Sequence, residues 1–157
     1  MYVNYCILSD YFVHLFTLKH FGSKCDFNSQ RDQDLLRAYR NELAICDSIH
    51  MEKIAKRIAI SPSCRFWVSE ERALNVVNSI RQGKALDSMR PTKRRMFTEI
   101  YKRFMSLLES NPDASPTDLI YKVVNSPAPE FYMTWKSIVV ILHRARKTMR
   151  ISKRYIP

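Results

Sequence analysis

The stretches SPSCRFWVS (residues 61–69) and SPAPEFYMT (residues 126–134) decide the fold, because they are two versions of one pattern. We call the distance from position 61 to position 126 the repeat offset. Over these nine aligned positions three residues are identical and three form conservative pairs. On both sides of each stretch, apolar residues recur at a spacing of three to four, and chain-breaking residues fall at matching places. We therefore predict two degenerate copies of one helical module.

Each copy is expected to hold a helix, a break, a short helix, an extended piece and a third helix. In the first copy, Asn28 or Ser29 caps the first helix, Ser61-Pro62 ends the second, and Ser69 and Gly83 bound the third. In the second copy the corresponding signals are Thr92, Ser115-Pro116, Ser126-Pro127 and Thr134.

The run IVVIL at residues 138–142 has the β-branched composition of a buried strand. Its counterpart in the first copy, residues 73–77, lies in a capped amphipathic pattern, so we predict helix for both. The aromatic pairs Phe66-Trp67 and Phe131-Tyr132 are expected to fill the core of the module, although stacking on nucleic-acid bases is the alternative.

The fold class is predicted as all-α, with two tandem degenerate three-helix modules that can pack as one helical domain. Gly22 and Gly83 are the only glycines, too few for the tight turns of a β-rich protein or for a glycine-rich phosphate loop. The expected organisation is residues 1–27 as an N-terminal extension, 28–83 as module 1, 84–95 as a basic connector with the start of the next helix, 96–149 as module 2, and 150–157 as a basic tail.

The formal net charge is +11, and most of it lies in two segments. Residues 84–95 hold five Lys and Arg against one acidic residue, and residues 126–157 hold seven against one. Such a concentrated excess indicates a surface that faces a polyanion, whereas the alternative is a solvating charge with a basic tail.

Nothing in the pattern suggests an enzyme, a metal site or a cofactor. The cysteines Cys6, Cys25, Cys46 and Cys64 lack metal-ligand spacing, and we expect reduced thiols in an intracellular, cytoplasmic protein. The four histidines are scattered, and no nucleophile, base and orienting group suggest themselves. Asp10, His14 and Lys19 interrupt the aromatic N-terminal stretch, so neither a signal peptide nor a membrane span is expected.

The segment from Ile54 to Ser63 looks like the second helix and turn of a helix-turn-helix unit, and the three-helix order of each copy resembles that DNA-binding superfamily. About ten residues separate the second and third helices, where a standard turn has three or four. Either the recognition helix begins at Pro62, or the module is a different three-helix unit.

The resemblance implies that the third helix of each copy reads DNA with its solvent face. In the second copy this face offers Lys136, Ser137, His143, Arg144, Arg146 and Lys147, followed by Arg150 and Lys153 in the tail. In the first copy it offers Arg72, Asn75 and Arg81, and the run Lys93, Arg94 and Arg95 is expected either to follow a DNA backbone or to form an exposed first helical turn. Because Glu70 and Glu71 would repel phosphates, the second copy is expected to bind better.

The leading functional hypothesis is a non-enzymatic protein, with regulation as one option, that binds nucleic acid, most plainly duplex DNA. The alternative is a helical adaptor or assembly protein that binds a protein partner through its apolar and aromatic faces. Neither hypothesis includes a membrane, a cofactor or a small-molecule substrate.

Overall fold

The computed structural model describes residues 24–46 and 49–154, with side chains described for residues 27–46 and 49–147. These parts of the chain fold into helices and contain no strand, which confirms the predicted all-α class. The helices are α1 (Lys24–Ile45), α2 (Met51–Ile60), α3 (Glu70–Arg81), α4 (Pro91–Ser110), α5 (Pro116–Val124) and α6 (Trp135–Arg154).

Most helix ends fall where the local chemistry predicts them. Ser69 accepts a hydrogen bond from the Arg72 N–H, and Thr134 accepts one from the Ser137 N–H, so both cap their helices as expected. Two predicted starts were wrong. The N-cap of α4 is Arg90 and proline at 91 takes the first helical position, because proline there has no N–H that needs a partner, so Thr92 lies inside the helix. Helix α1 already begins at Lys24, ahead of Asn28 and Ser29.

The strand-like run 138–142 is helical, as predicted from its counterpart. Ile138, Ile141 and Leu142 are buried, whereas Val140 between them is 66% exposed. Spacings of three and four therefore place the apolar side chains on one face of α6, in agreement with an amphipathic helix.

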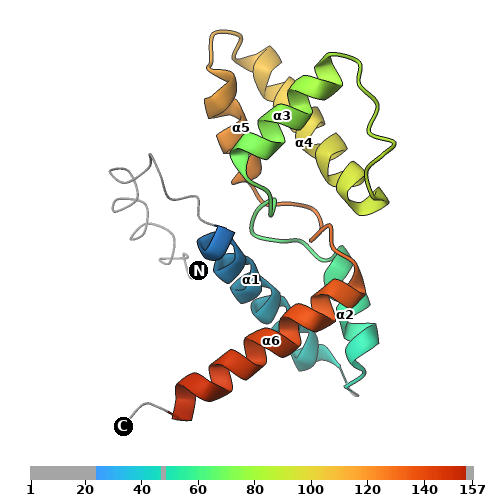
Figure 1. The fold of residues 1–157 in the computed structure, drawn as a ribbon, viewed down its shortest axis with the longest axis vertical. Coiled ribbons are helices and arrows are strands. Elements are labelled where there is room, and N and C mark those ends of the chain that lie inside the picture. Colours follow the sequence, from blue (N-terminus) through green and yellow to red (C-terminus); the bar gives the residue numbers. More distant parts are fainter. Residues whose placement is uncertain (1–23, 47–48, 155–157) are drawn as a thin grey trace.

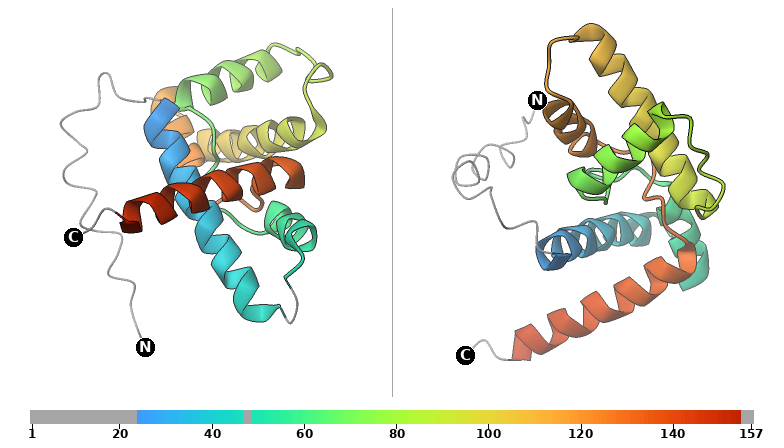
Figure 2. Two further views of the ribbon diagram at one scale, coloured as in Figure 1. Left: turned by 60° about the horizontal axis from the view of Figure 1, so that its bottom comes forward. Right: turned by 45° about the horizontal axis from the view of Figure 1, so that its top comes forward.

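The helices pack into two three-helix units, and each unit takes its third helix from the other half of the sequence (Figure 1). Helix α6 packs against α1 and α2, while α3 packs against α4 and α5. Two further views show the same grouping (Figure 2). Each unit has its own core of buried side chains. We call them the α1–α2–α6 core and the α3–α4–α5 core.

Two crossing segments, residues 61–69 and 125–134, carry the chain from one unit to the other. They lie side by side where Ser63 and Ala128 exchange both backbone hydrogen bonds, at 3.0 and 3.1 Å. A turn of three or four residues would return α3 onto α2, whereas the longer extended segment takes α3 across to α4 and α5. The long gap between the second and third helices thus has a structural consequence.

The aromatic residues of these segments fill the two cores. Phe66 is fully buried in the α3–α4–α5 core, and Phe131 is buried in the α1–α2–α6 core. Trp67 and Tyr132 are half-buried, and each packs against the opposite core from its neighbour. The interpretation of these residues as core side chains is confirmed.

The repeat offset also relates positions in the structure. It carries the start of α2 at Met51 onto the start of α5 at Pro116, and the start of α3 at Glu70 onto the start of α6 at Trp135. The paired residues Ser63 and Ala128 are equivalent positions under the same offset. The Oγ of Ser61 donates to the Ile58 carbonyl at 2.9 Å, and the equivalent Oγ of Ser126 donates to the Val123 carbonyl at 2.7 Å.

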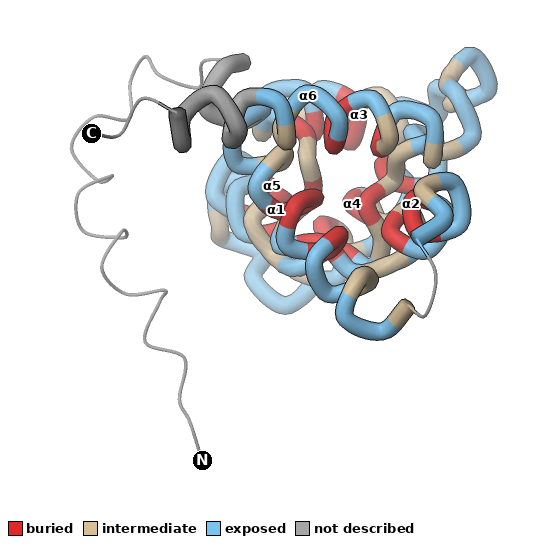
Figure 3. Tube along the Cα trace, turned by 90° about the horizontal axis from the view of Figure 1, so that it is seen from below, coloured by how far each residue is buried: buried red, intermediate tan, exposed pale blue. Residues whose placement is uncertain are grey.

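The third helices α3 and α6 lie on the same side of the molecule. In Figure 1, α6 crosses in front of α1 and α3 crosses in front of α4. Seen from below, both run along one edge, with exposed residues outward and buried residues inward (Figure 3). None of the described helices is both long and apolar enough to cross a membrane.

Candidate nucleic-acid interface

The outer face of α6 is a stripe of exposed, mainly basic residues. Lys136, Val140, His143 and Lys147 are spaced by four, three and four residues, which places them on one side of the helix. All four are exposed, and the opposite face supplies the α1–α2–α6 core. Although α6 is packed against α1 and α2, its polar stripe therefore stays accessible to a partner. We call these four residues the α6 stripe.

Other predicted residues of α6 contact α1. Arg144 donates to the Asp32 carboxylate at 2.7 Å, and the guanidinium of Arg146 lies 5.7 Å from the centre of the Tyr39 ring. Arg146 also donates to the Tyr39 hydroxyl at 3.5 Å. Ser137 contributes to the capping contacts with Thr134. These contacts orient the flanks of α6 and leave the α6 stripe as its most available surface.

Two predicted residues lie in α6 without described side chains. The helix extends to Arg154, so Arg150 and Lys153 belong to it, but their side chains lie outside the described residues.

The outer face of α3 is less positive than that of α6. Arg72, Asn75 and Arg81 are exposed there, as predicted. Glu71, also exposed, occupies the position that corresponds to Lys136, and Glu70 forms an ion pair with Arg65 at 3.2 Å. The exposed faces of the two third helices therefore differ in charge.

The run Lys93, Arg94 and Arg95 lies in the first turn of α4 and is exposed. Arg94 pairs with Asp87 at 3.6 Å, and Arg95 pairs with Glu130 at 2.9 Å. Because Glu130 belongs to the crossing segment that leads into α6, the Arg95 contact places this basic turn beside that segment.

Lys56 and Lys53 of α2 were not singled out from the sequence, and Lys56 lies close to the start of α6. The Nζ atoms of Lys56 and Lys136 each lie 5.6 Å from the centre of the Trp135 ring, and Lys53 is exposed one turn earlier on α2. Lys56 also pairs with Glu52 at 2.7 Å, and this hydrogen bond, followed by the lysine charge, lowers the pKa of the Glu52 carboxyl. The sequence pattern could have identified both lysines as exposed, since Lys53 and Lys56 fall on the polar face of α2.

A shallow open groove lies beside the first turn of α4, lined by Arg94, Arg95, Thr98, Glu99, Glu130 and Tyr132. Burial, followed by the negative charges of Glu99 and Glu130, raises the pKa of the Tyr132 hydroxyl to about 12. The side chain stacks on Phe66, with ring centres 6.0 Å apart, and its backbone has φ 52°. Two carboxylates and two guanidinium groups line this groove, so their charges balance and it does not favour an anion.

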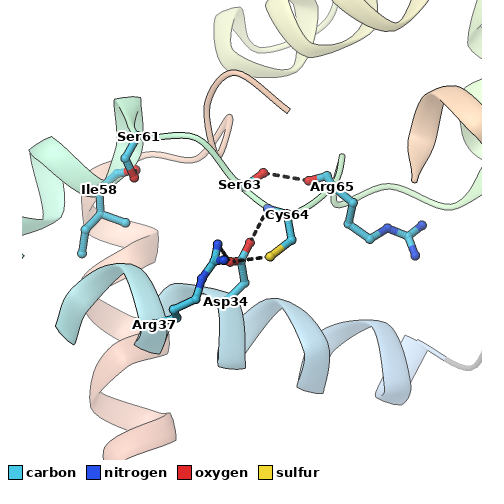
Figure 4. A network of polar contacts seen from close by, with 7 residues as sticks. All are labelled: Asp34, Arg37, Ile58, Ser61, Ser63, Cys64 and Arg65. Atoms are coloured by element: carbon cyan, nitrogen blue, oxygen red, sulfur yellow. Dashed lines mark hydrogen bonds and ion pairs between the residues drawn. The ribbon is translucent and has the colours of Figure 1, made fainter. Parts of the chain in front are cut away.

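A buried carboxylate anchors the first crossing segment to α1 (Figure 4). Asp34 is 5% exposed and accepts hydrogen bonds from the backbone N–H of Cys64 at 2.9 Å and from its thiol at 3.1 Å. It also pairs with Arg37. Burial, then the hydrogen bond and charge of Asp34, raise the pKa of the Cys64 thiol to about 11. At neutral pH this thiol is protonated and a poor nucleophile, which fits a structural role.

The second crossing segment is held by a guanidinium group instead. Arg103 donates to Glu99 at 2.7 Å, to the Ser126 hydroxyl at 3.0 Å and to the Pro127 carbonyl at 2.7 Å. Its guanidinium lies 5.1 Å from the centre of the Phe66 ring. Among the described residues, no group of three or more His, Cys, Asp or Glu side chains is placed to hold a metal ion.

Comparisons with protein-family models, with curated proteins and with solved structures find no match to this chain.

Proposed function

We propose that this protein binds duplex DNA as a non-enzymatic factor, with the α6 stripe as its main contact. The observation that carries this function is the exposed row of Lys136, His143 and Lys147 along one side of a helix whose other side is fixed in a core. Lysine side chains on a rigid helix suit phosphate contacts, because each neutralised phosphate releases counterions. Val140, in the middle of the row, is an apolar group of the kind that contacts a thymine methyl.

The common orientation of α3 and α6 supports the same function. Both helices face one side of the molecule, and the repeat offset relates their positions. Two recognition helices on one face are the means by which dimeric helix-turn-helix proteins reach successive turns of the major groove. We attribute the correspondence to duplication of one three-helix module within a single chain.

The two copies differ in the contribution we assign to them. At the α3 position equivalent to Lys136 of α6, the chain has Glu71, whose negative charge repels phosphates. We therefore assign α3 the weaker phosphate binding of the two helices. The basic turn of α4 adds the exposed Lys93, whereas Arg94 and Arg95 already pair with carboxylates of the chain. Affinity in this scheme comes mainly from α6, and α3 fixes the orientation of the duplex.

Fluorescence anisotropy with a labelled duplex tests this function over a range of salt concentrations. We expect the double substitution Lys136→Gln and Lys147→Gln to reduce the slope of log affinity against log salt by about 2, since each phosphate contact contributes about 0.9. Lys102→Gln with Lys122→Gln removes the same charge from exposed positions on α4 and α5 and is the matched control. Equal losses in both pairs would assign the binding to net charge, and no binding at low salt would exclude the function.

A protein partner is the second candidate, because large apolar side chains are exposed at the end of α1 and in the loop that follows it. Ile45 is 78% exposed and Ile49 is 72% exposed. Clusters of exposed apolar groups are typical of protein interfaces, and these two residues are close in the sequence. Replacement of both by Ser leaves DNA affinity unchanged if DNA is the partner of α6, and abolishes partner capture if the adaptor role is correct.

A further inference from the structure

A basic and aromatic face forms where the start of α6 meets α2. Lys56 and Lys136 flank the ring of Trp135 at 5.6 Å each, and Lys53 and Ile60 share the exposed side of α2 with Lys56. Ile60 is 70% exposed, an unusual position for a large apolar side chain. We call these five residues the α2–α6 face. It combines positive charge with apolar groups that water solvates poorly.

The structurally equivalent face of the other unit has the opposite charge. Under the repeat offset, Asp118 takes the position of Lys53 and Glu71 takes that of Lys136. Tyr121 is 48% exposed and takes the position of Lys56. The end of α5 meets the start of α3 here, since the Asn125 amide donates to Glu70 at 3.5 Å. The α5–α3 face consists of Glu70, Glu71, Asp118, Tyr121 and Asn125.

We propose that copies of this protein associate head to tail, with the α2–α6 face of one copy docked on the α5–α3 face of the next. The two faces have the same helical framework and complementary charge, so equivalent positions attract between copies. Opposite potentials across an interface speed the encounter and fix its register. Trp135 on one side and Tyr121 on the other supply aromatic anchors of the kind that carry binding energy at interfaces.

Part of each face is already neutralised within the chain. Glu52 pairs with Lys56, and Arg65 pairs with Glu70. The attraction between copies is therefore carried mainly by Lys53 and Lys136 on one face and by Glu71 and Asp118 on the other. Ile60 and Trp135 offer contacts to protein side chains that a phosphate backbone does not use, which favours a second copy over nucleic acid as the occupant of this face.

Head-to-tail contact has a distinct consequence for assembly. The interface joins two different surfaces, so each bound pair leaves one face of each kind unoccupied at its ends. Such a heterologous contact continues into a ring or an open filament and does not stop at a dimer. This inference does not depend on the proposed DNA binding, and because Lys136 belongs to both surfaces, a second copy and DNA would compete for it.

Analytical ultracentrifugation of the full chain without nucleic acid tests the association. We expect the average mass to rise with protein concentration at about 0.05 M salt and to fall toward the monomer at about 0.5 M salt, because the charges are exposed and easily screened. A wild-type protein that stays monomeric at high concentration and low salt would overturn the proposal.

Two neutralised variants give the sharper test. Lys53→Gln removes one of the two free charges of the α2–α6 face, and Lys56→Gln releases the Glu52 carboxylate, whose negative charge offsets Lys136. The double variant therefore neutralises this face and leaves the α6 stripe intact, whereas Glu71→Gln with Asp118→Asn neutralises the α5–α3 face. Each variant alone is expected to associate at least about tenfold more weakly than the wild type. Mixed together, they retain one working face each, so they form a 1:1 dimer and nothing larger.

Circular dichroism checks that both variants are folded, which is expected because all four positions are solvent-accessible. Glu109→Gln with Asp113→Asn is the control for loss of negative charge at exposed positions away from the α5–α3 face. Association that survives in both single-face variants, or a mixture that stays monomeric, would overturn head-to-tail docking. So would a loss of DNA affinity in the α2–α6 variant with no change in its mass, since the face would then belong to nucleic acid.

Discussion

Replacement of Leu142 with alanine tests the exchange of third helices between the two units. Leu142 is fully buried and belongs to the α1–α2–α6 core, although its sequence neighbours are α4 and α5. The substitution removes three carbon atoms, worth about 0.8 kcal/mol each, or about 2.5 kcal/mol in all. A residual cavity adds to this, so we expect a loss of about 2–5 kcal/mol in the free energy of unfolding.

Urea denaturation measures this loss, and methyl NMR of the isoleucines locates it. Ile54 and Ile58 lie in the same core as Leu142, whereas Ile100 and Ile120 lie in the α3–α4–α5 core. The methyl shifts of the first pair are expected to change and those of the second pair to stay nearly constant. Val77→Ala is the reciprocal variant, because Val77 is the buried residue of α3 that corresponds to Leu142. It should cost about 1.5 kcal/mol and perturb Ile100 and Ile120.

The opposite pattern of shifts would refute the exchange of third helices between the two units. If Leu142→Ala changed Ile100 and Ile120 while Ile54 and Ile58 were unaffected, α6 would pack within its own half of the sequence. The reciprocal variant excludes the explanation that one core is simply more sensitive than the other.

Three further predictions concern the crossing segments and the turn after α3. The pKa of Cys64 is raised from 9.0 to about 11 and that of Tyr132 from 10.0 to about 12, so the folded state holds these protons longer than the unfolded chain. The resulting stability is complete below about pH 9 and falls as the pH rises through about 11 and 12, and urea denaturation across this range should show a shallower decline in the Cys64→Ser, Tyr132→Phe variant. Asp34→Asn is expected to lower the Cys64 pKa and to speed the reaction of this thiol with a disulfide reagent at mildly alkaline pH; an unchanged rate would contradict the assigned role of the carboxylate. Gly83 has φ +76° with no atom near an added Cβ, so Gly83→Ala should cost about 1 kcal/mol by thermal denaturation, and Gly83→Asn less, since asparagine tolerates this conformation better.

The elements of this fold follow from local sequence signals. Ser69 and Thr134 both cap the helices expected of them, and comparison with residues 73–77 correctly predicted helix for the strand-like run 138–142. Local chemistry was sufficient there because a cap or a buried stripe depends on residues a few positions away. The predicted start of α4 at Thr92 was wrong by a small margin, because Arg90 caps the helix and the proline at position 91 takes its first position.

The pairing of helices did not follow from the sequence. The stripes of α3 and α6 have the same periodicity, so either stripe could fill either core. What separates the alternatives is the path of the crossing segments, which depends on the Ser63–Ala128 pairing and on the Asp34 and Arg103 contacts. These contacts join residues distant in sequence, and no local pattern predicts them.

For the same reason, only part of the candidate interface could be predicted. The exposed positions of α6 follow from periodicity, and Lys136, His143 and Lys147 are exposed as expected. Arg144 instead pairs with Asp32, far away in the sequence, and Arg95 pairs with Glu130. Counting charges along a chain identifies basic segments, but it does not show which of their side chains meet a distant carboxylate.

The exchange of third helices also sets the order in which this chain can fold during synthesis. Helices α1 and α2 leave the ribosome long before α6. Their shared core lacks its third helix until residues 138–142 have emerged. Until then Leu35, Ile54 and Ile58 face water or a chaperone, and the α3–α4–α5 unit, whose helices emerge consecutively, is complete first. Translation that pauses after α5 would therefore leave a nascent chain with one finished unit and one open apolar surface.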